Sequence, residues 1–246
     1  MRWILITFVA SLALLSPARS GDLVVLSSVG AKSALELLKP EFEQQGHRLS
    51  IRYDTAAALK REIDLGLGFD VALLTNAISK SLTKESRLIH SEHRIFAYAK
   101  IGLAAKAGSP KPDISSTEAF TRTLLAANTI SHARDGASGQ YFRKLIKQLG
   151  IEDQLSGKLL PMTGSKEIEA VADGHATYGV QLISEIISVK GIEFVAPFPA
   201  ALQNVTELDL DISVSAMNLD LARQFVTFLR SEKARETIFR VGLDPP

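Results

Sequence analysis

The chain has 246 residues, of which 46% are hydrophobic and 22% are charged, and it contains no cysteine. This composition is typical of a globular protein with one large domain or two smaller ones, and it excludes a low-complexity disordered chain. The lack of cysteine excludes a disulfide scaffold, a zinc–thiolate site and a catalytic cysteine. With 28 basic and 27 acidic residues, the formal charge of +1 gives no indication of nucleic-acid binding.

The first twenty residues have the pattern of a secretion signal. Arg2 precedes an apolar run of 13 residues, and Ala18 and Ser20 are small residues at the −3 and −1 positions of a cleavage site. The run is shorter than the ~20 residues needed to cross a bilayer, which favours cleavage over anchoring. We therefore expect a signal peptide over residues 1–20, cleavage after Ser20, and an exported mature protein that begins at Gly21.

The next part of the chain alternates strands with helices. Buried strands are predicted at 23–26, 49–53 and 70–75, and helices at about 31–45 and 56–65. Pro40 lies inside the first helix and is expected to kink or restart it. Successive strand–helix units predict a mostly parallel sheet with helices on both of its faces.

From residue 94 onward the pattern changes. A long apolar segment over 94–106 has the look of an extended strand, and a loop rich in proline and glycine follows it. Ser115 and Glu118 form a capping box before a helix around 120–127. Further strands are predicted at 129–131, 178–180, 191–195 and 212–216, and further helices from residue 138 to about 149, up to residue 172, and from about 219 to 240.

Several segments, in this order and spacing, resemble the molybdate-binding-protein-like branch of periplasmic solute-binding proteins, the receptors of bacterial ABC importers. They are VVLSSVGAKSALE, TAAALKREIDLGLGFDVALLT, HARDGASGQYFRKLIKQLGI, YGVQLISEI and FVTFLRSEKARETIFRVGLDPP. The resemblance implies an α/β fold of the periplasmic binding protein type II: two α/β domains with mostly parallel sheets, joined by two hinge strands, with a ligand cleft between them.

The resemblance also implies a division of the chain. Domain 1 would comprise residues 21–97 plus 199–246, and domain 2 would comprise residues 98–198. The segment 94–106 would be the outgoing hinge strand, and 195–199 the return.

Candidate ligand-binding residues follow the predicted strands, where helix N-termini offer unpaired N–H groups to an anion. Four loops have this position, and a glutamine ends a short strand beside them. The candidates are Ser27, Ser28 and Gly30 in the first loop, Thr55 and Ala56 in the second, Arg134, Gly136, Ser138 and Gly139 in the third, Ser165 in the fourth, and Gln181. The hydroxyls have a plain alternative as helix caps, and Arg134 as a surface partner of Asp135.

The ligand is expected to be an organic anion. In the molybdate-binding family, as the resemblance implies, neutral donors hold the oxyanion: a Ser in each of the first two loops and a Tyr near the second crossover. Those positions hold Gly30, Ala56 and Leu182 here, so all three hydroxyls are missing. Arg134 adds a planar, fully charged fork suited to a carboxylate. We therefore expect a small carboxylate rather than molybdate.

The sequence thus predicts a monomeric periplasmic binding component that presents a small anionic ligand to the permease of an ABC importer. No catalysis, cofactor, metal or nucleic-acid partner is predicted; the close pair His90 and His93 lacks a clear third metal ligand. Two alternatives stay open. One is a secreted hydrolase or isomerase with an acid–base pair such as Asp54 and His132. The other is a periplasmic sensor subunit that engages a receptor kinase.

Overall fold

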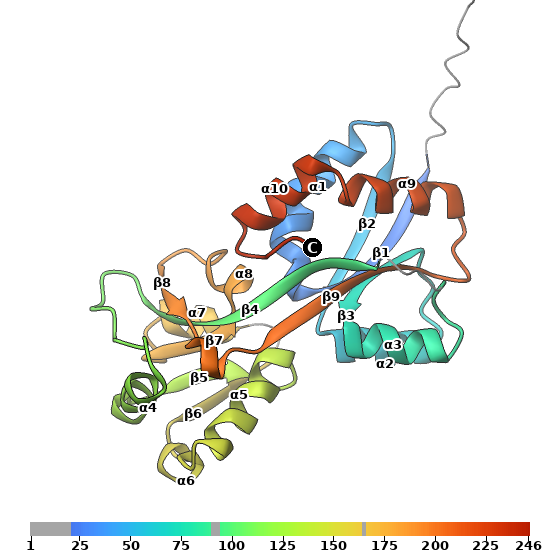
Figure 1. Cartoon of the computed structure of the whole chain (residues 1–246). Helices are drawn as coiled ribbons and strands as arrows, with labels where there is room; N and C mark the ends of the chain where they lie inside the picture. Colours follow the sequence, from blue (N-terminus) through green and yellow to red (C-terminus); the bar gives the residue numbers. More distant parts are fainter. Residues whose placement is uncertain (1–20, 90–93, 164–165) are drawn as a thin grey trace, which may run out of the picture.

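Two α/β lobes, joined by a pair of long strands, make up the computed structural model, which describes residues 21–89, 94–163 and 166–246 (Figure 1). The predicted signal peptide, the candidate Ser165 and the pair His90 and His93 lie outside the described residues. Within those ranges, no helix combines the length and apolarity needed to cross a membrane.

Lobe 1 contains a parallel three-stranded unit with helices on both faces. Its strands are β1 (Asp22–Ser28), β2 (Arg48–Asp54) and β3 (Val71–Thr75), and β1 pairs in parallel with the other two. Its helices are η1 (Val29–Ala31), α1 (Lys32–Glu43), α2 (Ala56–Asp64), α3 (Asn76–Lys84), α9 (Leu219–Leu229) and α10 (Glu232–Arg240). Helices α1, α9 and α10 cover one face of the sheet, and α2 and α3 cover the other (Figure 1).

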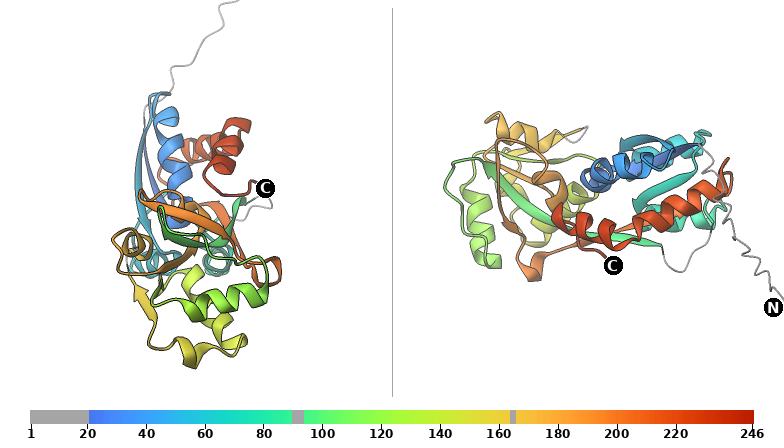
Figure 2. Two further views of the ribbon diagram at one scale, coloured as in Figure 1. Left: turned by 90° about the vertical axis from the view of Figure 1, so that its left-hand side faces the viewer. Right: turned by 90° about the horizontal axis from the view of Figure 1, so that it is seen from above.

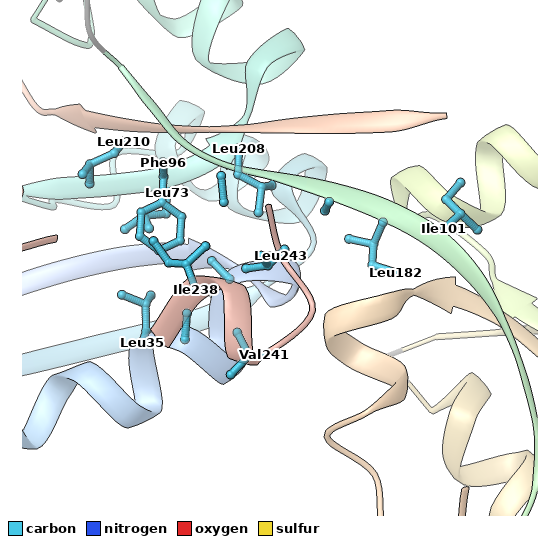
Figure 3. Packing of buried hydrophobic residues seen from close by; sticks show 14 of the residues in the cluster. Leu35, Leu73, Phe96, Ile101, Leu182, Leu208, Leu210, Ile238, Val241 and Leu243 are labelled. Atoms are coloured by element: carbon cyan, nitrogen blue, oxygen red, sulfur yellow. The ribbon is translucent and has the colours of Figure 1, made fainter. Parts of the chain in front are cut away.

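The apolar run of β3 explains this layering. Because side chains alternate along a strand, Val71 and Leu73 enter the core under α1, whereas Ala72 and Leu74 enter the core under α2 and α3. Figure 3 shows the first of these cores, where Leu73 lies with Leu208 and residues of α1 and α10. Full burial of a leucine side chain contributes roughly 1.5–3 kcal/mol, so a strand that is apolar on both faces is stable only between two helical layers.

Lobe 2 repeats the parallel arrangement. Its strands are β5 (Ile130–Ala133), β6 (Leu159–Met162), β7 (Tyr178–Leu182) and β8 (Ile192–Pro197), and β5 pairs in parallel with β6 and β7. Its helices are α4 (Thr117–Ala126), α5 (Ala137–Gln148), α6 (Glu152–Leu155), α7 (Glu167–Ala172), α8 (Ile183–Ile186) and η2 (Ala200–Leu202). Seen from above, the two lobes lie end to end (Figure 2).

The lobes are connected by β4 (Ile95–Lys106) and β9 (Val205–Ile212), which run antiparallel to each other. The first half of β4 pairs with β9, and its second half pairs with β7 and β8, also antiparallel. The sheet order is therefore β2-β1-β3-β9-β4-β7-β5-β6, with β8 on β4. The long strand predicted at 94–106 is confirmed. The domain boundaries predicted near residues 98 and 199 stay predictions.

Three predicted elements were wrong in position. The strand predicted at 212–216 is β9, which ends at Ile212. The last helix is two helices, because the Ser231 hydroxyl caps a new one by accepting a hydrogen bond from the Ala234 N–H at 3.3 Å. The cap of α4 is Ser116 rather than Ser115, and its hydroxyl accepts from Ala119 N–H at 3.2 Å. Pro40 lies inside α1, which runs on past it to Glu43.

Candidate ligand-binding cleft

A cavity of about 640 Å³ lies between the lobes. It is lined from lobe 1 by the ends of β1 and β2 and by the first residues of α2 and α3, and from lobe 2 by the β5–α5 loop and the end of β7. Residues 204–208, at the start of β9, complete the lining. The cavity thus lies beyond the carboxyl ends of parallel strands, which is the usual ligand position in open α/β sheets.

Most of the predicted site residues line this cavity. They are Ser28, Gly30, Thr55, Ala56, Arg134, Gly136, Ser138 and Gln181. Their role in binding a ligand stays a prediction. Ser27 and Gly139 are not lining residues. The buried Ser27 hydroxyl donates to the Ser28 carbonyl oxygen at 3.0 Å, and a Cβ on Gly139 would lie 1.7 Å from the Ala133 carbonyl oxygen.

Two hydroxyl groups in the lobe 1 wall make few hydrogen bonds within the protein. Ser28 ends β1, is only 5% exposed, and its Oγ has no hydrogen-bond partner. Thr55 caps α2, since its Oγ1 accepts from the Ala58 N–H at 3.2 Å, and the hydroxyl hydrogen is left to donate. Both amide hydrogens of Asn76, in contrast, are used within the protein, because the amide donates to Glu207 at 2.7 Å and to Asp209 at 2.9 Å on β9.

The lobe 2 wall is a connected chain of buried polar side chains. The Ser138 hydroxyl donates to Gln181 Oε1, and Gln181 Nε2 donates to Glu167 Oε1. The Leu182 N–H also donates to Gln181 Oε1 at 2.8 Å. The three side chains come from α5, β7 and α7, and each is at most 4% exposed. These side chains of the lobe 2 wall are therefore hydrogen-bonded to one another.

Two carboxyl groups in the cavity wall titrate above their ordinary range. Burial raises the pKa of Glu167, and hydrogen bonds from its own backbone N–H and from Gln181 oppose that rise. Burial also raises the pKa of Glu185 to about 8, and the nearby charge of Glu167 adds to this effect. Both groups therefore tend to carry a proton at a pH where exposed carboxyls are ionised.

Arg134 lies at the exposed mouth of the cavity. Its backbone N–H donates to the Met162 carbonyl oxygen at 2.7 Å, which ties the loop to β6. Its guanidinium makes one long contact, 3.5 Å to the Pro161 carbonyl oxygen. Arg134 thus lines the cavity together with Ala137 and Ser138, which belong to the start of α5, where no side chain caps the helix.

The suggested acid–base pair is not brought together at this cavity. Asp54 is a lining residue, and its Oδ1 accepts from the Thr55 N–H at 2.6 Å. His132 is 1% exposed and is not a lining residue. Its ring packs against Phe142 at 5.7 Å between centroids, and burial lowers its pKa.

Residues 23–244 match the family of bacterial extracellular solute-binding proteins. The chain belongs to this family. The structure is similar to the periplasmic molybdate-binding protein of Azotobacter vinelandii, with a TM-score of 0.76 and 18% identity over 91% of this chain and 99% of that one. It is also similar to the sulfate-binding protein SubI of Mycobacterium tuberculosis, with a TM-score of 0.75 and 15% identity over 92% of this chain and 87% of that one.

One relative in sequence is named as an enzyme rather than as a binding protein. The chain is 28% identical, over 243 residues, to the aconitate isomerase of a Pseudomonas species, covering 96% of this chain and 92% of the relative. The family match and the structural likenesses confirm the predicted resemblance and the predicted two-domain α/β fold. The positions where the resemblance implied hydroxyl donors, Gly30, Ala56 and Leu182, all line the cavity of this solute-binding protein.

The sequence interpretation missed Glu167, Glu185 and Asn76. Asn76 was within reach of the rule that found the other candidates, since it follows the predicted strand at 70–75 directly. Glu167 follows the loop of the candidate Ser165, but nothing local distinguishes it from the exposed Glu169 two residues later. Its importance comes from contact with Gln181, which only the packing of α7 on β7 creates.

Proposed function

We propose that this protein captures a small organic carboxylate in the interdomain cleft and presents it to the permease of an ABC importer. The observation that carries the proposal is that Arg134 and the uncapped start of α5 line the same cavity. A guanidinium binds a carboxylate through two parallel hydrogen bonds, and helix-end N–H groups add favourable charge. In this proposal the protein is exported to the periplasm after loss of residues 1–20 and acts as a monomer.

Two features favour a carboxylate over an inorganic oxyanion. Gly30, Ala56 and Leu182 give the cavity no hydroxyls where a molybdate site would need them. A buried anion that lacks even one good donor loses about 1–3 kcal/mol. The name of the isomerase relative points to aconitate, a tricarboxylate, so we place tricarboxylates first among the candidate ligands.

Calorimetry tests this proposal with citrate, tricarballylate, cis-aconitate, trans-aconitate, sulfate and molybdate. We expect a tricarboxylate to bind with one site, and Arg134→Ala to weaken that binding by about 1.5–3 kcal/mol, the scale of a hydrogen bond to a charged group. Arg122→Ala is the matched control, because Arg122 is exposed on α4 and is not a lining residue. Submicromolar molybdate binding, or unchanged affinity in Arg134→Ala, would contradict the proposal.

A second candidate is isomerisation of an unsaturated carboxylate. It is favoured by the isomerase relative, together with the buried carboxyl of Glu167 in the cavity wall. Shifting a double bond next to a carboxylate requires removal of a proton from one carbon and its return to another, and a carboxyl with a raised pKa suits both steps. Proton NMR of cis-aconitate in D₂O decides between the two: an importer component leaves it unchanged, whereas an isomerase produces deuterated trans-aconitate.

A further inference from the structure

One oxygen of a buried carboxyl in the cavity wall has no partner. Glu167 is the first residue of α7 and is 1% exposed. Its Oε1 accepts from the Gln181 amide, whereas its Oε2 makes no hydrogen bond. Its backbone oxygen is fixed as well, because the Ser131 hydroxyl donates to it at 2.6 Å. The side chain is therefore held in place with Oε2 left over.

The neighbouring amide decides where a proton on Glu167 would sit. Gln181 Oε1 receives two donors, the Ser138 hydroxyl and the Leu182 N–H, so the amide is fixed with its oxygen toward them. Its Nε2 must then face Glu167, and Oε1 of Glu167 must accept. A proton on this carboxyl therefore belongs to Oε2, the oxygen that has no partner in the protein, on a side chain of a residue that lines the cavity.

The groups that favour a charge on Glu167 are neutral ones, its own backbone N–H and the Gln181 amide. None of the ion pairs within the described ranges includes it. Two like charges act near it, Glu169 on its own helix and Glu185 on α8, and Lys32 on α1 acts on Glu185. Arg134 and Asp135 line the same cavity from the β5–α5 loop. A buried carboxylate without a cation is costly, which favours its neutral form.

We propose that Glu167 binds the ligand as a neutral acid, donating its Oε2–H to a carboxylate oxygen, so that ligand capture takes up a proton. This inference rests on the proposed capture of a carboxylate. The proton comes from solvent and ends on Glu167, shared with the ligand oxygen, and no covalent bond to the ligand changes. An ionised Glu167 would instead face the ligand with like charge. Affinity should then fall by up to about tenfold for each pH unit above the titration of Glu167.

The test is calorimetry of tricarballylate, citrate and trans-aconitate at pH 5.5 and pH 8, each in two buffers of different ionisation enthalpy. Tricarballylate has no double bond to shift, so its heat reports binding alone. We expect proton uptake on binding, and more of it at pH 8 than at pH 5.5, because more of Glu167 is ionised before binding at the higher pH. No binding by any of the three acids would overturn the proposed tricarboxylate ligand. Binding without uptake at pH 8, or with proton release, would overturn only this inference.

Two variants identify the carboxyl that takes the proton. Glu167→Gln keeps a donor at the position of Oε2, so it should bind with proton uptake lost and with affinity nearly independent of pH. Glu185→Gln is the matched control, since Glu185 is the other cavity carboxyl with a raised pKa, and it should keep the uptake. The reverse pattern would overturn the inference. If Glu167→Gln does not fold, the wild-type uptake together with Glu185→Gln still decides the matter.

Discussion

The two walls of the cleft use similar side chains in opposite ways. In lobe 2, Ser138, Gln181 and Glu167 bond to one another, and all three are buried. In lobe 1, the Ser28 hydroxyl is equally buried but has no partner, and Thr55 serves only the first turn of α2. The serine of the lobe 2 wall is therefore held by the protein, while the serine of the lobe 1 wall has a hydroxyl that a ligand would satisfy. Substitution of Ser138 should therefore cost stability, and substitution of Ser28 should cost binding.

The largest loss of stability is expected at Gly139 in lobe 2, where there is no space for a side chain. A Cβ at Gly139 would lie 1.7 Å from the Ala133 carbonyl oxygen, so α5 cannot keep its place against β5 in Gly139→Ala. We expect a loss of about 3 kcal/mol or more in the free energy of unfolding, at the upper end of overpacking costs. Gly157→Ala is the control in the same lobe, because nothing lies within 4 Å of its Cβ position. Equal midpoints in urea for the two variants would show that the β5–α5 junction yields easily.

A smaller loss is expected when the centre of the lobe 2 network is removed. Gln181→Leu leaves Ser138 and Glu167 without their shared partner, which should cost about 2–3 kcal/mol, since each buried group left unsatisfied costs about 1–3 kcal/mol. Gln154→Leu, at an exposed position of α6, is the control.

The loss in Gln181→Leu should also depend on pH. The Gln181 amide lowers the pKa of Glu167, so its removal raises that pKa further above the unfolded value. A raised folded-state pKa gives stability that is present at low pH and lost as pH rises through it. Chemical unfolding at pH 5 and pH 8 should therefore show the greater loss at pH 8. A loss that is equal at both pH values would argue that Glu167 is not coupled to Gln181.

Local patterns predicted the parts of the fold that are apolar and continuous. The run at 70–75 indicated a strand buried on both faces, which β3 is. Strand β9 was misplaced because Asp209 and Asp211 alternate with its leucines, and acidic residues normally indicate an exposed face. Both aspartates are at most 2% exposed, and Asp209 accepts from Asn76, 133 residues earlier in the chain. Such compensation depends on tertiary contacts and leaves no local signal.

The candidate site also contains residues that local patterns predict and residues that depend on tertiary contacts. The rule that ligands lie beyond strand ends predicted Ser28, Thr55 and Arg134, which line the cavity, because it needs only the order of strands and helices. The same rule included Ser27 and Gly139, which serve packing instead. It could not find Glu167, since that residue matters only through the parallel register that brings β7 beside β5 and α7.

A modest effect is expected from the cap in the lobe 1 wall. Thr55→Ala removes the acceptor for the Ala58 N–H, and loss of an N-cap side chain typically costs about 1 kcal/mol. Thr83→Ala in α3 is the control, because its hydroxyl only donates to the Ser79 carbonyl oxygen of its own helix. Thermal unfolding of both variants checks this, and a Thr55→Ala midpoint no lower than that of Thr83→Ala would show that the cap contributes nothing.

The smallest change in stability is expected at Ser28, where the contrast between the walls is sharpest. Its buried Oγ has no partner, so Ser28→Ala removes a polar atom that folding has already desolvated without compensation. Unfolding free energy should change by less than about 0.5 kcal/mol or rise slightly. Ser138→Ala makes the same substitution in the other wall, where it breaks the hydrogen bond to Gln181 and should cost about 1–2 kcal/mol of stability.

Calorimetry with a tricarboxylate should show the weaker binding in Ser28→Ala, by about 1 kcal/mol, because of the two hydroxyls only that of Ser28 has no partner in the protein and can donate to the ligand. Equal losses of stability in the two variants would mean that Ser28 is held by the protein after all, and that the two walls do not differ.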